Sequence, residues 1–110
     1  MREFIKDARF EFVNGGWSTN NEACPTFQDL IENMMVGHSW LFKEFGFVPK
    51  IGWLMDTAGH SSGNARLYSD MGLEALFVGQ LDHKDLAKRS TEKSLNYLWR
   101  PFSKHFGNQH

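Results

Sequence analysis

Apolar residues recur along the chain at two different spacings, and these spacings predict helices alternating with short strands. Between Pro25 and Gly46 they recur every three or four residues, the period of one face of a helix. We expect this helix to begin at Glu22 or just after Pro25, with Pro25 in its first turn, and to end at Gly46. Its apolar positions are Phe27, Leu30, Ile31, Met34, Met35, His38, Leu41 and Phe42.

Three further segments have helical patterns. Residues 1–7 resemble the end of a helix, and a second helix is expected to begin at Ser61 or Ser62, with Gly72 as its C-cap. A polar third helix is expected to follow Asp82 and to run to about residue 94. The inner side of the second helix would carry Ala65, Leu67, Tyr68 and Met71.

Four short runs predict strands. Residues 9–13 alternate Phe with polar residues, and residues 51–55 form a bounded apolar run typical of a strand that is buried on both faces. Residues 73–78 and 95–99 are further candidates. Strands that alternate with helices form a parallel sheet with right-handed crossovers, so the fold class is α/β.

Composition narrows the function classes. The chain has 110 residues, enough for one domain, and a formal net charge of −1, which gives no electrostatic reason to expect nucleic acid or membrane surfaces as partners. Its single cysteine, Cys24, excludes an internal disulfide framework and a cysteine-based zinc site. No window is long and apolar enough to predict a membrane span, and residues after Met1 do not resemble a signal peptide.

One carboxylate stands where parallel sheets build active sites. Asp56 directly follows the apolar run 51–55, and the C-terminal ends of parallel strands carry the catalytic residues of α/β barrels. Asp is also a favoured N-cap residue, so Asp56 could instead begin the next helix. Its position alone leaves both interpretations open.

The residues around Asp56 resemble a known signature. Trp53-x-x-Asp56-x-x-Gly59-His60-Ser61 is similar to the nucleophile motif of the glycoside hydrolase family 38 α-mannosidases, in which a Trp stands three residues before the nucleophilic Asp. Further segments resemble that family in the same order, from about residue 4 to the C-terminus. Together they cover only a fraction of the family's catalytic domain. These segments are Phe10 to Trp17, Asn20 to Ala23, Gly72 to Asp82 and Leu98 to Pro101.

The resemblance implies a fold and a reaction. Residues 1–110 would be part of a catalytic domain built as a seven-stranded, irregular α/β barrel. The activity would be zinc-dependent, retaining hydrolysis of α-mannosides in mannose-containing glycans, with Asp56 as nucleophile and as a zinc ligand. The general acid and the other zinc ligands would lie outside this chain, so the isolated chain should be inactive. The family also implies a lysosome, a vacuole or another compartment of the secretory pathway.

Five residues are candidates for substrate binding. Trp17 and Trp53 could stack on a sugar, although Trp in a strand more often packs in a core. Glu22 lies in an element near the family's sugar site, although helix N-termini also favour Glu. His60 could bind substrate or order the loop, and Gln80 stands where the family has an Arg near the nucleophile.

Two other sets of polar residues have simpler explanations. Asp82, His83 and Asp85 could bind a metal, but the start of a solvated helix explains them better. His38 lies on the apolar side of the long helix and is expected to be a hydrogen-bonded core histidine.

Departures from the family cluster around the expected site, a pattern typical of a lost or redirected active site, so we keep an alternative function. Thr57 and Ala58 replace Pro-Phe, Asn21 replaces Asp, Thr26 replaces a His, and Gln80 replaces the Arg. The alternative is a catalytically degenerate relative that acts as a glycan-binding or interaction module. A third hypothesis, a carbohydrate deacetylase, would lack the Gly-Gly-Trp and Leu-Trp-Arg segments that this chain has.

Overall fold

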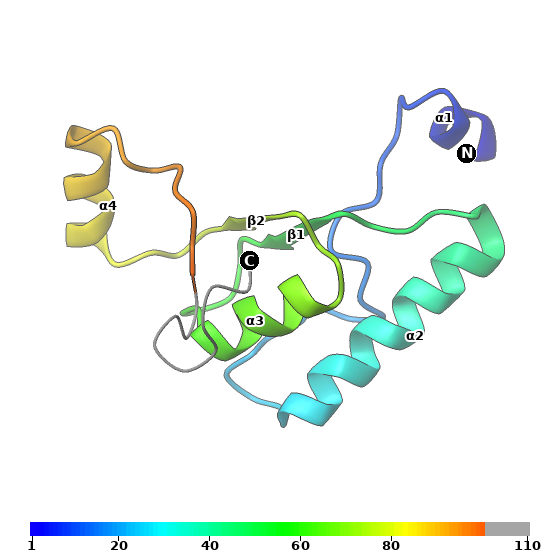
Figure 1. The fold of residues 1–110 in the computed structure, drawn as a ribbon, viewed down its shortest axis with the longest axis horizontal. Coiled ribbons are helices and arrows are strands. Elements are labelled where there is room, and N and C mark those ends of the chain that lie inside the picture. The colour runs from blue at the N-terminus through cyan, green and yellow to red at the C-terminus, as the bar shows by residue number, and fades with distance from the viewer. Residues whose placement is uncertain (101–110) are drawn as a thin grey trace.

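The computed structural model describes residues 1–100, which form helices around a sheet of two parallel strands (Figure 1). This arrangement agrees with the expected α/β class, while the seven-stranded barrel stays a prediction. Pro101, which ends the Leu98–Pro101 segment, and residues 102–110 lie outside the described residues. The elements are α1 (Arg2–Lys6), α2 (Phe27–Phe45), β1 (Ile51–Leu54), α3 (Ser62–Asp70), β2 (Ala75–Val78) and α4 (His83–Thr91).

Helix α2 is the longest element, and its ends follow from local chemistry. Thr26 is the N-cap, and it forms a capping box with Asp29, in which each side chain bonds to the backbone N–H of the other residue. These hydrogen bonds lower the pKa of Asp29. Gly46, at φ 66°, ends the helix in the left-handed conformation that glycine adopts without strain. Pro25 therefore precedes the cap, and the expectation that it lies in the first turn is wrong.

A β1–α3–β2 unit forms the centre of the molecule. The two strands pair in parallel, from Ile51 with Ala75 to Leu54 with Val78. Leu54, Tyr68 and Met34 form the buried core, so the strand, α3 and α2 meet at one point. No helix within residues 1–100 is long and apolar enough to cross a membrane.

Helix α3 begins as the sequence predicts and ends one residue earlier. Ser61 is its N-cap and accepts a hydrogen bond from the backbone N–H of Asn64. Its C-cap is Met71, and Gly72 follows it at φ 85°, outside the helix. Tyr68 is buried as expected, whereas the other predicted inner residues, Ala65, Leu67 and Met71, are half-buried.

One face of the sheet is open, so the expectation that the 51–55 run is buried on both faces is wrong. Gly52 and Leu54 are buried against α3, but Trp53 is 47% exposed on the opposite face. Its ring packs against that of Phe77, which is 53% exposed, with centroids 5.6 Å apart. Within the described residues, about half of each of these two side chains stays exposed.

Residues 9–13 are not a strand. Phe12 packs against Phe10, Phe45 and Phe47, with ring centroids 5.1 to 5.8 Å apart. The chain reaches β1 only at Asn14, where a backbone turn at φ 59° allows one hydrogen bond to Ile51. The alternation of Phe residues therefore marks an extended segment that packs on the end of α2 without joining the sheet.

Residues 95–99 are not a strand either, and α4 stops at Thr91 rather than near residue 94. The ring of Tyr97 lies 4.4 Å from the guanidinium carbon of Arg89, so this segment folds back on α4. Leu98 is 75% exposed. Within the described residues the sheet has two strands, and neither pairs with this segment.

Candidate active site at the end of strand β1

A cavity of about 700 Å³ opens at the C-terminal end of β1. Asp56 lies two residues beyond the strand, is exposed, and lines the cavity. Trp17, which is 66% exposed, and Trp53 line it as well, together with Trp40 from α2. Three indole rings and one carboxylate therefore share this space, and among residues 1–100 no other charged side chain lines it.

The loop that carries Trp17 rests directly on the backbone of α2. A β-carbon on Gly37 would overlap the carbonyl oxygen of Gly15, so only glycine permits this approach. Asn33 holds the loop from the same helix, because its backbone oxygen accepts from the N–H of Trp17 at 3.0 Å and its Oδ1 accepts from the N–H of Ser18 at 2.8 Å. The indole of Trp17 packs edge-on against that of Trp40, with centroids 6.5 Å apart. This wall of the cavity is thus fixed by helix α2.

Asn14 joins four parts of the structure. Its backbone N–H donates to the carbonyl oxygen of Ile51 at 2.7 Å, and its Oδ1 accepts from the N–H of Trp53 at 3.2 Å. The same Oδ1 accepts from the hydroxyl of Tyr68 at 2.8 Å, and its carbonyl oxygen bonds to Nε2 of His38 at 2.8 Å. Asn14 therefore takes the place of a neighbouring strand at the edge of β1. The bond to half-buried His38 agrees with the expected core histidine.

A buried polar cluster of Asn20, Asn64 and Tyr68 holds Asn14 in place through the hydroxyl of Tyr68. Nδ2 of Asn20 donates to Oδ1 of Asn64 at 3.1 Å and to the hydroxyl oxygen of Tyr68 at 2.9 Å. Asn20 and Asn64 are 1% and 2% exposed. Burial raises the pKa of Tyr68, although the hydrogen bonds from the asparagines oppose the shift. Sequence reasoning missed this cluster, because asparagine is typical of turns and carries no signal of burial.

The loop after Asp56 is held at its C-terminal end, where His60 and Ser61 each make one contact. The carboxylate of Glu22 accepts a hydrogen bond from the backbone N–H of Ser61. Nε2 of His60 lies 2.6 Å from the carbonyl oxygen of Gly79, to which it donates. Both contacts are to backbone groups, so Glu22 and His60 order this loop. Contacts of either residue with substrate stay predictions.

Gln80 lies in a second, smaller pocket of about 240 Å³. It follows β2 by two residues at φ 52°, as Asp56 follows β1, so both leave the same edge of the parallel sheet. His60, Tyr97 and Trp99 line this pocket with it. Of the candidate residues, Trp17, Trp53 and Asp56 thus share one cavity, whereas Gln80 and His60 share another.

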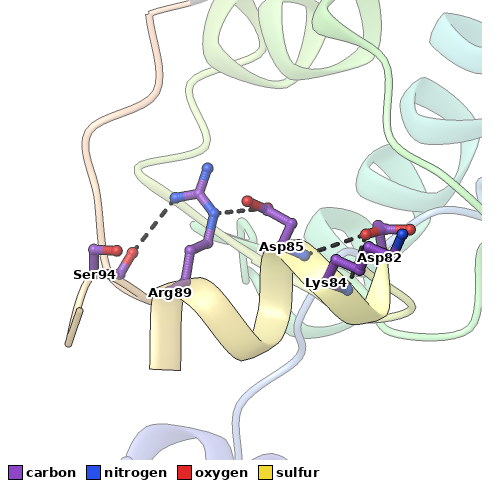
Figure 2. Close-up of polar contacts among 5 residues, drawn as sticks. All are labelled: Asp82, Lys84, Asp85, Arg89 and Ser94. Carbon is purple, nitrogen blue, oxygen red and sulfur yellow. Dashed lines mark hydrogen bonds and ion pairs between the residues drawn. The ribbon is translucent and has the colours of Figure 1, made fainter. Parts of the chain in front are cut away.

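The hypothesis of a metal site at the start of α4 is wrong. Figure 2 shows Asp82 as the N-cap, with Oδ1 accepting from the backbone N–H groups of Lys84 and Asp85 at 2.9 and 3.2 Å. The carboxylate of Asp85 instead accepts from Nε of Arg89 at 2.7 Å, and Arg89 also reaches the carbonyl oxygen of Ser94 (Figure 2). Among residues 1–100, no three His, Cys, Asp or Glu side chains are grouped to hold a metal ion.

The residues that depart from the family motif lie in different parts of the structure. Thr57 is 3% exposed and lines the Asp56 cavity, while Ala58 is exposed. Thr26 caps α2, and Oδ1 of Asn21 accepts from the N–H of Ala23 at 3.2 Å. Thr26 and Asn21 thus serve local turns, and neither lines the cavity.

Comparison with known proteins identifies the family. Residues 1–105 match the family described as the glycosyl hydrolases family 38 N-terminal domain. The chain is 36% identical over 100 residues to the lysosomal alpha-mannosidase of Dictyostelium discoideum, covering 91% of this chain and 10% of that protein. It is 37% identical over 106 residues to an alpha-mannosidase of Canavalia ensiformis, covering 96% of this chain and 11% of that protein. The chain thus spans about a tenth of these relatives, and it belongs to glycoside hydrolase family 38, within the N-terminal domain.

Proposed function

We propose that the protein carrying this chain hydrolyses α-mannosidic bonds in mannose-containing glycans, with Asp56 as the nucleophile of a retaining mechanism. The observation that carries the proposal is the position of Asp56, exposed at the C-terminal end of β1 in a cavity that Trp17 and Trp53 also line. Indole faces stack on the apolar faces of sugars, and a carboxylate beside them can reach an anomeric carbon. Relatives named as alpha-mannosidases support the same activity.

The proposed reaction takes its nucleophile from this chain and its general acid from sequence beyond it. In a retaining hydrolysis the Asp56 carboxylate would attack the anomeric carbon, while a second carboxyl about 5 Å away protonates the leaving oxygen. Within the described residues, Asp56 is the only carboxylate that lines the cavity. The general acid is therefore proposed to come from outside this chain.

The proposal includes a zinc ion, with Asp56 as one ligand. Structural and catalytic zinc sites take at least three protein ligands. The described residues hold no such group, so the remaining ligands would come from sequence beyond this chain. Several relatives are named lysosomal alpha-mannosidases, which supports a lysosome, a vacuole or another secretory-pathway compartment for the whole protein.

A second candidate function is supported by the residues around the cavity. No cationic side chain lines it within residues 1–100, and Gln80 lies in the other pocket. Among the described residues, the cavity therefore places no cationic side chain beside Asp56. A degenerate relative that binds glycan or a partner through the cavity would have this arrangement.

One experiment separates the two candidates. A protein that contains this segment within a whole catalytic domain is treated with a fluorinated mannosyl fluoride, which traps a glycosyl-enzyme ester, and its peptides are mapped by mass. We expect the label on Asp56, and a loss of turnover of at least about a thousandfold in Asp56→Asn. Asp70→Asn, an exposed carboxylate on α3, is the matched control. An unlabelled, inactive protein that still binds mannosides would support the second candidate.

A further inference from the structure

Strand β1 is held along its two edges by different parts of the chain. One edge pairs with β2. On the other edge, the carbonyl oxygen of Ile51 accepts from the backbone N–H of Asn14 at 2.7 Å, and the N–H of Trp53 donates to Oδ1 of Asn14 at 3.2 Å. A side-chain oxygen therefore holds the backbone of Trp53, which lies three residues before Asp56.

The same residue begins the loop that forms the aromatic wall of the cavity. Trp17 lies three residues after Asn14, as Asp56 lies three residues after Trp53. All four of these residues line the cavity. The hydrogen bond from Trp53 to Asn14 thus joins the wall that carries Trp17 directly to the strand that leads to Asp56.

Asn14 is in turn fixed by residues of this chain. Its Oδ1 accepts from the hydroxyl of Tyr68 at 2.8 Å, and Tyr68 is 2% exposed. Its carbonyl oxygen bonds to Nε2 of His38 at 2.8 Å. A β-carbon on Gly15 would lie 2.5 Å from Cγ of Pro49, so the next residue also packs closely. Because all these partners lie within the chain, they hold Asn14 whatever surface the rest of the domain covers.

We propose that the side-chain oxygen of Asn14 is a positioning group for the nucleophile, which fixes Trp53 and thereby sets where Asp56 stands relative to Trp17. The inference rests on the proposed function and adds a residue that acts through Trp53. An amide oxygen has two lone pairs, and Trp53 and Tyr68 use both, so this oxygen is not left to bind substrate. A misplacement of about 1 Å costs about a hundredfold in rate, which is why such a group matters.

The backbone conformation of Asn14 allows a clean set of variants. Its φ of 59° lies in the left-handed region, which glycine, asparagine and aspartate tolerate. Asn14→Gly removes the side-chain oxygen and keeps the backbone bonds to Ile51 and His38. Asn14→Asp keeps an oxygen acceptor and removes the amide nitrogen, which lies 4.0 Å from Sδ of Met34. Asn96→Gly makes the same change at an exposed site and is the matched control.

The variants are made in a protein that contains this segment within a whole catalytic domain. In Asn14→Gly the amide of Trp53 loses its acceptor, so its hydrogen exchange, followed by mass spectrometry, should become at least about tenfold faster. Rates in α4 should stay unchanged. On the plateau of the pH profile, kcat for an aryl α-mannoside should fall about a hundredfold, and KM should change far less. Asn14→Asp should restore both the exchange rate and kcat, and Asn96→Gly should alter neither.

Each measurement can overturn the proposal by itself. Unchanged exchange at Trp53 in Asn14→Gly would overturn it, and so would faster exchange throughout the domain, which would indicate a general loss of stability. Faster local exchange with an unchanged kcat would overturn the positioning of the nucleophile. A fall in kcat that Asn14→Asp does not restore would overturn it too, because the effect would then belong to the amide nitrogen. A wild-type protein without turnover or a label on Asp56 would instead refute the proposed function, and the exchange rates would still decide whether Asn14 fixes the strand.

Discussion

Gly37→Ala should destabilise the fold, although alanine is the better helix former. A β-carbon at this position would overlap the carbonyl oxygen of Gly15 and lie 2.6 Å from the backbone nitrogen of Trp17. Both are backbone atoms, so no side-chain rotation relieves the clash, and the loop must move off the helix. Alanine gains about 1 kcal/mol of helix propensity, and overpacking of a closed contact costs about 1–3 kcal/mol or more. Because the atoms that the new β-carbon meets belong to the backbone, we take the upper end of that cost. The free energy of unfolding should then fall by about 2 kcal/mol.

Gly63→Ala is the matched control, since Gly63 also lies in a helix but its β-carbon would meet only Oγ of Ser61, at 3.8 Å. This variant should be as stable as the wild type or gain up to about 1 kcal/mol. Urea unfolding followed by far-UV circular dichroism measures both variants on one scale. If Gly37→Ala matched or exceeded the wild type while Gly63→Ala behaved as expected, the direct contact between the Trp17 loop and α2 would be refuted.

The purified chain, supplied with zinc, should not hydrolyse an aryl α-mannoside, because the reaction needs two carboxyl groups and one described carboxylate lines the cavity. Turnover that is abolished by Asp56→Ala would contradict this prediction. Burial raises the pKa of Tyr68, so its contribution to the free energy of unfolding should be intact below pH 10.0 and fall as the pH rises further. Urea titrations should show that loss in the wild type and not in Tyr68→Phe, and an equal loss in both would rule Tyr68 out. Hydrogen bonds from Thr26 lower the pKa of Asp29, so the capping box should stabilise α2 above pH 3.8 and lose that effect as the pH falls through the lowered value. Asp29→Asn should flatten this acid limb of the stability profile, and an unchanged limb would assign it to other carboxylates.

Local patterns predicted much of the fold, because the chemistry that sets these elements is local. The three- and four-residue spacing of apolar side chains located α2, and Gly46 marked its end. Asp82 and Ser61 are N-caps, as their residue types indicate. The strand pairing of β1 with β2 followed from an apolar run on each side of a helix.

The two wrong strand predictions share one cause, which is that a strand needs a partner that local sequence does not identify. Phe10 and Phe12 do lie in an extended segment, but their neighbours are the rings at the end of α2. Residues 95–99 have an apolar pattern, yet within residues 1–100 they pair with neither strand of the sheet. The apolar positions of α2 also cover more of the helix than the core buries, since Met35 is 58% exposed.

Sequence reasoning predicted the carboxylate and the aromatic walls of the candidate site. It did not predict the residues that hold them in place. Asp56 was located by a strand end, and the structure brings Trp17 and Trp53 to the same cavity; the roles of all three in catalysis or binding stay predictions. Asn14 was missed, and so was its hydrogen bond with Tyr68, because this contact joins residues far apart in the chain. Such contacts leave no periodic signal.

The contacts of Asn14 also bear on the order in which the chain folds. Its hydrogen-bond partners lie 24, 39 and 54 residues away, at His38, Trp53 and Tyr68. Each contact closes a long loop, and loop closure costs entropy before any contact repays it. Helix α2 and the β1–α3–β2 unit can form from nearer neighbours, so the segment that carries Asn14 and Trp17 should join last. The aromatic wall of the cavity would then be completed only after the sheet that carries Asp56 is already in place.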